Sequence, residues 1–250
     1  MSTAISTPKS ASPQTAEIAT PDRHSSPGRV LITGGSSGLG AAIVSAVSAA
    51  GGTPIVLDLV GSEASSSYEV DVSDTANAGA VVAAAAEAHG GLDAIVTAAG
   101  IDRCGRLEDV DRVEWERVIM VNLLGTVGIV RAALPYLKQS HGRVITVASS
   151  LGLKAVPDAT AYCASKFGII GFTRALAAEM RGEIGVTALV PAGMRTHFFD
   201  NRDEKYRPHD NSKLNDPARV AEAVLFVLGQ PRGCEVRELV IAQEEDDSWP

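Results

Sequence analysis

Short apolar runs that alternate with helix-length segments constrain the fold of this chain most. Seven such runs recur between Arg29 and Ala242: RVLITG, TPIVLDL, SYEVDV, LDAIVTAAG, GRVITVASS, GVTALVP and VRELVIA. Most lack the alternation of apolar and polar residues seen in a sheet with one solvent-facing side, which indicates strands covered on both faces. Between them, residues 39–50, 75–89, 109–138, 161–181 and 216–229 are Ala-rich or amphipathic. The alternation predicts a single α/β domain, with a doubly wound parallel sheet of about seven strands and helices on both faces.

The two ends of the chain differ in composition from residues 29–242, which we predict to be the folded domain. Residues 1–28 are rich in Ser, Thr, Pro and Ala, with few aliphatic residues, and predict a disordered leader. This leader lacks the apolar core of a secretory signal, and its Glu17, Asp22 and scarce Arg disfavour a transit peptide. Residues 243–250, QEEDDSWP, predict an acidic tail that is solvated.

Charge and cysteine usage exclude several function classes. The 250-residue chain has a formal charge of −8 and no cluster of Lys and Arg, so we expect no nucleic-acid partner. Its apolar runs fall short of the roughly 18 residues that span a membrane, so we expect no membrane partner. Cys104, Cys163 and Cys234 lie far apart without CxxC spacing, which predicts no disulfide framework, no metal site and a reducing, cytoplasmic location. We expect Cys163 to be a small half-buried thiol.

A glycine-rich stretch, TGGSSGLG, runs from Thr33 to Gly40 and joins the first predicted strand to the first predicted helix. Glycines at such a junction let a pyrophosphate approach the backbone, and the helix N-terminus supplies N–H groups and a positive dipole end. The context of strand, loop and helix predicts a nucleotide-binding loop. The residues expected to contact the nucleotide here are Gly34, Ser36, Ser37, Gly38, Leu39 and Gly40.

Asp58 ends the second predicted strand, eighteen residues after Gly40. A carboxylate at this position reaches the ribose 2′-hydroxyl of NAD and repels the 2′-phosphate of NADP. Its neighbours are Leu57 and Leu59, and Ser37 rather than a basic residue precedes Gly38. These features favour NAD over NADP as the cofactor. The alternative is that Asp58 is an ordinary turn residue at the strand end with no contact to a cofactor.

Tyr162 and Lys166 stand four residues apart in AYCASKFG, which places them on one face of a helix. Alone, this spacing is more typical of a tyrosine packed on a lysine stem at the helix surface. Together with a nucleotide-binding loop it suggests a base for alcohol oxidation. The Lys166 ammonium, with a cationic nicotinamide nearby in the oxidised complex, favours the phenolate and should lower the tyrosine pKa.

Further motifs follow in order. They are Asp71-Val72, the AAG of Ala98, Ala99 and Gly100, Asn122 in VNLLG, and Ser149 in VASS, thirteen residues before Tyr162. From about Arg29 to Ile241 the chain therefore resembles the short-chain dehydrogenase/reductase family. The resemblance implies a Rossmann fold and an NAD-dependent oxidoreductase that interconverts a secondary alcohol and a ketone. Two alternatives stay open: an NADP-linked carbonyl reductase, and a non-catalytic NAD-binding sensor or scaffold.

The resemblance also implies roles for particular residues. Tyr162 would be the general acid/base, Ser149 would contact the substrate oxygen, and Lys166 would hold the nicotinamide ribose. Asn122 would hold a water, or would merely satisfy its own helix. The resemblance adds these residues to the cofactor site: Asp71, Val72, Ala98, Ala99, Gly100, Tyr162, Lys166, Pro191 and Thr196.

The chain departs from the family pattern at three places, and three further residues are alternative candidates for the catalytic site. Thr97 replaces the family's Asn, Ala192 stands at an expected Gly, and the segment between Asp58 and Asp71 is short, which predicts a loop instead of a helix. Ser150 rivals Ser149, but strand alternation would put the two on opposite faces. We expect His141 to be a turn residue, and His197 lies in a segment that could touch substrate.

Residues 194–215 resemble the family's substrate lid and are mostly polar. We therefore expect a small or medium substrate that carries polar groups, and a lid that moves without ligand. The resemblance further implies a homodimer or homotetramer that pairs the helices at about 109–138 and 161–181.

Overall fold

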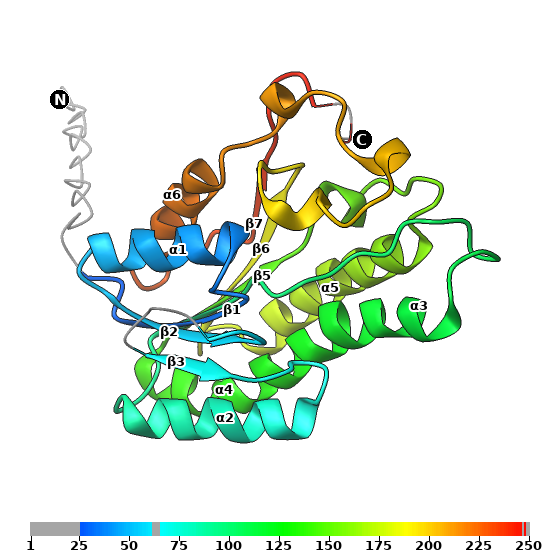
Figure 1. The fold of residues 1–250 in the computed structure, drawn as a ribbon. Helices are drawn as coiled ribbons and strands as arrows, with labels where there is room; N and C mark the ends of the chain where they lie inside the picture. Colours follow the sequence, from blue (N-terminus) through cyan, green and yellow to red (C-terminus); the bar gives the residue numbers. More distant parts are fainter. Residues whose placement is uncertain (1–25, 62–65, 247, 249–250) are drawn as a thin grey trace, which may run out of the picture.

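Seven parallel strands form one sheet in the order β3-β2-β1-β4-β5-β6-β7 (Figure 1). The computed structural model describes residues 26–61, 66–246 and 248. The strands are β1 Arg29–Thr33, β2 Thr53–Asp58, β3 Ser67–Glu69, β4 Ala94–Thr97, β5 Arg143–Val147, β6 Gly185–Pro191 and β7 Glu238–Ile241. The predicted doubly wound sheet is confirmed. Its order reverses between β1 and β4, so the carboxyl ends of these strands border a crevice suited to a ligand.

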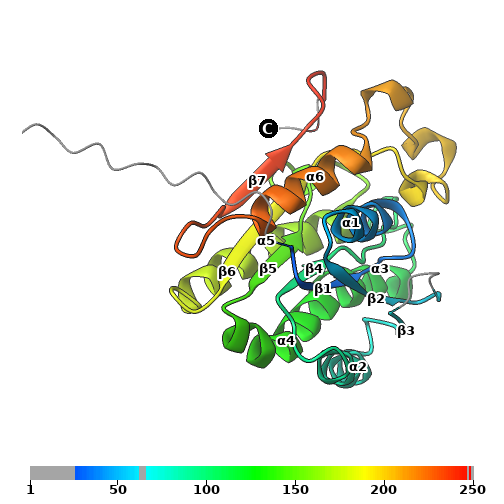
Figure 2. The same cartoon turned by 90° about the vertical axis from the view of Figure 1, so that its left-hand side faces the viewer.

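Helices cover both faces of the sheet (Figure 2). The helices are α1 Gly38–Ala49, α2 Thr75–Ala88, α3 Arg112–Ile119, α4 Thr126–Ser140, α5 Thr160–Glu179 and α6 Pro217–Leu228. α1 packs with α6 on one face, and α2 packs with α4 on the other, where α5 also lies. Short 3-10 helices are η2 Ser150–Gly152, η3 His197–Phe199, η4 Glu204–Tyr206 and η5 Asn211–Lys213.

Strand residues are buried on both faces, as the continuous apolar runs predict. In β1, Leu31 packs into the cluster beneath α2 and α4, whereas Val30 and Ile32 pack against α1 and α6. All three side chains are fully buried. Because every residue of such a strand loses contact with water, burial of its apolar area stabilises the sheet from both sides.

The predicted helix at 109–138 differs in detail. It begins at Arg112, because the Asp111 carboxylate caps the N–H of Val113 at 2.8 Å. A π-helical segment, η1 Met120–Gly125, then separates α3 from α4. The continuous stretch Arg112–Ser140 is long and apolar enough to cross a membrane by length and composition, contrary to the sequence estimate. Packing accounts for this apolarity on the inner face of α4, where Ile129 and Leu137 are fully buried against the sheet.

The connection between β2 and β3 contains no helix among its described residues, 59–61 and 66, which agrees with the predicted loop. Residues 62–65 and most of the predicted leader, residues 1–25, lie outside the described residues. The described part of the tail folds back over the carboxyl ends of the strands. Its exposed Glu245 pairs there with Lys213 at 2.9 Å.

Candidate active site

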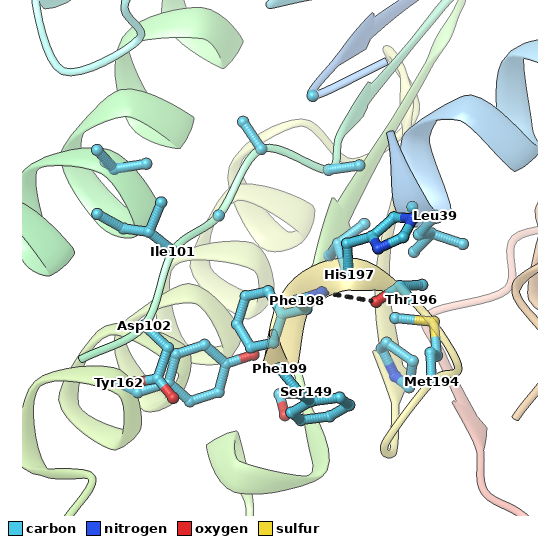
Figure 3. A pocket seen from close by; sticks show the side chains of 18 of the residues that line it. Leu39, Ile101, Asp102, Ser149, Tyr162, Met194, Thr196, His197, Phe198 and Phe199 are labelled. Atoms are coloured by element: carbon cyan, nitrogen blue, oxygen red, sulfur yellow. Dashed lines mark hydrogen bonds between the residues drawn. The ribbon is translucent and has the colours of Figure 1, made fainter. Parts of the chain in front are cut away.

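A cavity of about 680 Å³ opens at the carboxyl ends of the central strands (Figure 3). Most of the residues expected from the sequence line it. They are Gly34, Ser37, Gly38, Leu39, Gly40, Asp58, Asp71, Val72, Ala98, Ala99, Gly100, Ser149, Tyr162, Lys166, Pro191 and Thr196. Ser36 and Asn122 are not part of the lining. The fold thus brings one set of residues, spread over most of the domain, to a single site.

The glycine-rich loop after β1 leaves no room for larger residues. Gly34 has φ +69°, and a Cβ there would lie 2.8 Å from the Cα of Ala99. A Cβ on Gly40 would lie 2.0 Å from the carbonyl oxygen of Gly34. Ser37, the N-cap of α1, makes no side-chain capping bond to the described residues. The first N–H groups of α1 therefore border the cavity without a side-chain acceptor, which suits a phosphate.

Asp58 fixes this loop as well as lining the cavity. Its Oδ2 accepts a hydrogen bond from the backbone N–H of Ser36 at 2.9 Å. The Ser36 hydroxyl donates to the carbonyl of Val60 at 2.9 Å, which explains why Ser36 joins the loop to the end of β2 rather than facing the cavity. Asp58 is thus held at the end of β2 by the same loop that surrounds the phosphate position.

A cation that sequence reasoning missed borders the far end of the cavity. Arg117 of α3 lies 3.4 Å from the Asp71 carboxylate, and both residues line the cavity. Hydrogen bonds from Ser73, more than this guanidinium, hold the pKa of Asp71 below its usual range. The pair spans 46 residues, and no local sequence signal connects the two.

Ser149, Tyr162 and Lys166 meet in the wall of the cavity. Tyr162 and Lys166 lie on the first turns of α5, and Lys166 Nζ is 5.5 Å from the centroid of the Tyr162 ring. The ammonium donates to the carbonyl of Val147, the last residue of β5, at 2.9 Å. Ser149 follows β5, and its hydroxyl lies close enough to Tyr162 to favour the phenolate. The spacing of thirteen residues therefore places the serine hydroxyl next to the phenol.

Burial is the main influence on the pKa values of Tyr162 and Lys166. It raises the pKa of Tyr162 above its ordinary value, and the nearby Ser149 hydroxyl opposes that rise. Burial also lowers the pKa of Lys166 to about 8. The prediction that the Lys166 ammonium and a cationic nicotinamide together lower the tyrosine pKa concerns the oxidised complex and stays a prediction. Without the cofactor, burial sets the direction of the shift, and the Lys166 ammonium donates to the Val147 carbonyl.

Asn122 lies behind the cavity, in the π-helical segment η1. Its amide accepts from the N–H of Ile101 at 2.8 Å and donates to the carbonyl of Ile101 at 2.9 Å. It also donates to Ser165 Oγ at 3.1 Å. Among the described residues it therefore bonds to neighbouring segments rather than to its own helix, and it fixes the backbone that follows β4.

The departures from the family pattern are local. Thr97 is buried, and its hydroxyl has no hydrogen-bond partner among the described residues. The nearby Thr33 hydroxyl accepts from the N–H of Ala99 at 3.1 Å and so orients the AAG segment. Ala192 is buried, and its N–H donates to the carbonyl of Ile241. Neither departure removes a residue from the group around Tyr162.

The rival residues fall in different places. Ser150 is buried and lines the cavity beside Ser149, so their expected placement on opposite faces is wrong: β5 ends at Val147, and strand alternation no longer applies. His141 terminates α4 at φ +50°, which agrees with a turn residue. His197 lines the cavity rim, but its side chain is 89% exposed and pairs with Asp200.

The thiols differ in environment. Cys163 is buried and Cys234 is exposed. Cys104 lines the cavity, and burial raises the pKa of its thiol to about 12. A thiol with such a pKa stays protonated near neutrality and is a poor nucleophile.

Residues 194–215 cover the substrate side of the cavity and will be called the lid (Figure 3). The Phe198 ring lies 5.7 Å from the Tyr162 ring. Arg202 Nη2 donates to Asp102 Oδ2 at 2.6 Å, and the Tyr206 hydroxyl donates to Asp158 Oδ2 at 3.0 Å. Sequence reasoning missed Asp102 and Arg202, because their bond joins residues 100 positions apart.

The described tail residues complete this side of the cavity. Asp246 and Ser248 line it, and Ser248 Oγ lies 2.8 Å from Ser150 Oγ. Glu244 and Glu245 are exposed, in line with the predicted solvated tail, whereas Asp246 and Ser248 contact the site.

Comparison with known proteins agrees with this geometry. The family model for short chain dehydrogenases matches residues 29–207. The chain is 30% identical over 225 residues to 2-(S)-hydroxypropyl-CoM dehydrogenase 3 of Xanthobacter autotrophicus, covering 80% of this chain and 88% of that protein. It is 32% identical over 217 residues to the 3-oxoacyl-[acyl-carrier-protein] reductase of Thermotoga maritima, covering 79% and 88%.

Solved structures give the same fold. An alcohol dehydrogenase from Thermococcus sibiricus, complexed with 5-hydroxy-NADP, superimposes with a TM-score of 0.77 at 23% identity, covering 88% of this chain and 98% of that one. The aldohexose dehydrogenase of Thermoplasma acidophilum superimposes with a TM-score of 0.74 at 24% identity, covering 85% and 92%. The chain belongs to the short-chain dehydrogenase/reductase family and is an oxidoreductase of that family.

Members of this family bind NAD or NADP, and the cavity fits such a dinucleotide. A Cβ at Gly34 would strike the backbone of Ala99, and a Cβ at Gly40 would strike the backbone of Gly34. Glycine at both positions therefore allows the tight turn that places the N-terminus of α1 where a pyrophosphate would bind. Asp58 would face the adenosine ribose, and the segment from Ala98 to Gly100 would border the rest of the cofactor.

Proposed function

We propose that this chain oxidises a secondary alcohol to a ketone with NAD, and that Tyr162 is the general base. The reaction balances as R₂CHOH + NAD⁺ → R₂C=O + NADH + H⁺. The observation that carries the proposal is the meeting of Ser149, Tyr162 and Lys166 in one cavity with the glycine-rich loop.

Tyr162, Ser149 and Lys166 have different roles in proton transfer. Tyr162 takes the hydroxyl proton of the alcohol, and the Ser149 hydroxyl, which lines the same cavity, stabilises the charge that develops on the substrate oxygen. Lys166 keeps its ammonium near the phenol, and a pKa of about 8 lets it exchange a proton near neutral pH. When bound, NAD⁺ would supply the hydride acceptor and a positive charge, which would favour the Tyr162 phenolate against the effect of burial.

NAD is preferred to NADP in this proposal because of Asp58. Its carboxylate lines the cavity at the end of β2. A 2′-phosphate in the same place would be repelled. The alternatives remain an NADP-linked carbonyl reductase and a non-catalytic NAD-binding sensor or scaffold.

Parallel fluorescence titrations with NADH and NADPH test the cofactor, followed by a screen of secondary alcohols with NAD. Tight NADH binding, weak NADPH binding and NADH formation from an alcohol would support the proposal. A preference for NADPH would favour the carbonyl reductase. NADH binding without turnover of any alcohol or ketone would favour the sensor.

We also propose that the chain forms a homodimer or homotetramer. Large apolar side chains are exposed on neighbouring helical segments: Met120 and Leu124 of η1 and Phe167 of α5. Pairing of these faces with a second copy would remove them from water. Light scattering tests this, and a monomer at micromolar concentration would contradict it. A cytoplasmic location is proposed from the cysteine spacing and the three unpaired thiols.

A further inference from the structure

The substrate side of the cavity contains an ion pair that the proposed chemistry does not use. Asp102 follows β4, Arg202 belongs to the lid, and both line the cavity. Their side chains are 4% and 18% exposed. Asp102 raises the pKa of Tyr162 and Arg202 lowers it, so both charges lie close enough to act on the phenol. The pair is therefore adjacent to the reacting position.

This ion pair is incompletely satisfied. Only one guanidinium nitrogen, Nη2, reaches the carboxylate, and it contacts Oδ2 alone. Oδ2 also accepts from the Cys104 thiol at 3.3 Å, and Arg202 Nη1 donates to the carbonyl of Tyr206 at 3.3 Å. Among the described residues, Asp102 Oδ1 and Arg202 Nε are buried without a hydrogen-bond partner. A buried donor and a buried acceptor without partners are both costly, and they invite a ligand group that satisfies them.

The net charge of the Asp102–Arg202 pair indicates which kind of ligand group can bind there. The pair is neutral as a unit, so a carboxylate or phosphate would gain from Arg202 but be repelled by Asp102, and an ammonium would meet the reverse conflict. A neutral hydroxyl can donate to Oδ1 and accept from Nε–H at once. Because Arg202 lies on the lid and Asp102 on the body of the domain, displacement of the lid by an entering substrate exposes both atoms.

We infer that Asp102 and Arg202 bind a second hydroxyl group of the substrate, so that the enzyme prefers 1,2- or 1,3-diols and related polyols to simple secondary alcohols. The inference rests on the proposed alcohol oxidation. It assigns the ion pair a specificity role, separate from the proton transfer at Tyr162.

Matched alcohols test the inference. NADH formation is measured with butane-2,3-diol against butan-2-ol, and with cyclohexane-1,2-diol against cyclohexanol. Each diol is expected to show a kcat/KM at least about tenfold higher than its partner, since a hydrogen bond to a charged group contributes that much or more. In Asp102→Asn and Arg202→Met, the ratio of diol to mono-alcohol is expected to fall toward one, mainly through the KM of the diol.

Asp158→Asn supplies the matched control. Asp158 anchors the lid through Tyr206 but does not line the cavity, and its φ of +60° suits asparagine. This variant weakens closure of the lid for every substrate. The kcat/KM values for the diol and the mono-alcohol therefore change by the same factor, and their ratio is unchanged. The ratio therefore separates recognition of a hydroxyl from loss of lid structure.

Equal kcat/KM for diol and mono-alcohol in the wild type would overturn the inference and leave the proposed oxidation intact. An unchanged ratio in both Asp102→Asn and Arg202→Met would also overturn it. If no alcohol of either kind is oxidised while NADH still binds, the proposed function fails and the inference falls with it.

Discussion

The two sides of the cavity are built in different ways. The cofactor side consists mainly of backbone, with the Asp58 carboxylate at the end of β2: it includes the glycines between β1 and α1 and the AAG segment after β4. The substrate side consists of side chains from the lid and tail, held by bonds such as Arg202–Asp102 and Ser150–Ser248. Backbone requirements impose a fixed residue at a fixed place, whereas side-chain pairs can be built from many residue combinations. The first side is suited to one cofactor and the second to a changeable substrate.

The largest expected effect lies where the two sides meet, at Tyr162. Removing its hydroxyl in Tyr162→Phe should lower turnover by on the order of 10²–10⁴ while leaving NADH affinity nearly unchanged. Steady-state kinetics and NADH titration on the same preparation check this. Turnover near that of wild type would show that another group removes the proton, and the division between binding and chemistry would need to be redrawn.

The second effect tests the backbone requirement on the cofactor side. In Gly40→Ala the new Cβ would lie 2.0 Å from the carbonyl oxygen of Gly34, so α1 or the loop must shift. We expect NADH affinity to fall by about 10- to 100-fold, the usual range for overpacking.

Gly79→Ala is the control for that variant. Gly79 lies within α2, and its added Cβ would meet only the Cβ of Ala132 at 3.7 Å. This change should leave NADH affinity unaltered and stabilise the protein by about 0.5–1 kcal/mol, because alanine favours a helix. Equal affinities in the two variants would mean that the loop tolerates a Cβ and that its glycines are not required by space.

The same contrast explains what could be predicted from sequence. Apolar runs and glycine spacing report local backbone needs, so the strands, the helices and the loop from Gly34 to Gly40 could be predicted. The partner of Asp102 could not, because nothing near it in the chain signals an arginine 100 residues away. Ser150 was misplaced because the end of β5 at Val147 depends on packing rather than on pattern. The raised tyrosine pKa was missed because burial is a property of the folded molecule.

Lys166 gives a smaller effect, visible as a pH dependence of stability. Its pKa falls from 10.5 in the unfolded chain to about 8, so between these values the unfolded state holds a proton that the folded state releases. Stability contributed by this group therefore rises with pH across that window. Relative to Lys166→Met, the wild type should gain up to about 3 kcal/mol between pH 8 and pH 10.5.

Urea denaturation at half-unit steps of pH measures this difference without cofactor. Tyr162 is present in both proteins, so its own titration largely cancels when the two curves are subtracted. Parallel curves would show that the amine is hydrated in the folded state, contrary to its burial beneath the cavity.

The smallest effects compare one hydroxyl on each side of the cavity. Ser248→Ala removes the 2.8 Å bond to Ser150 over the substrate side, and Ser36→Ala removes the 2.9 Å bond to Val60 beside the cofactor loop. Each bond between neutral groups contributes about 0.5–1.5 kcal/mol, which corresponds to a few-fold change. Ser248→Ala should raise the KM for the alcohol and leave NADH affinity alone, and Ser36→Ala should do the reverse. A change confined to one side of the cavity cannot alter binding on the other side unless the two sides are energetically coupled. If the KM for the alcohol and the NADH affinity changed together in either variant, the lid, the tail and the glycine-rich loop would therefore respond as one unit.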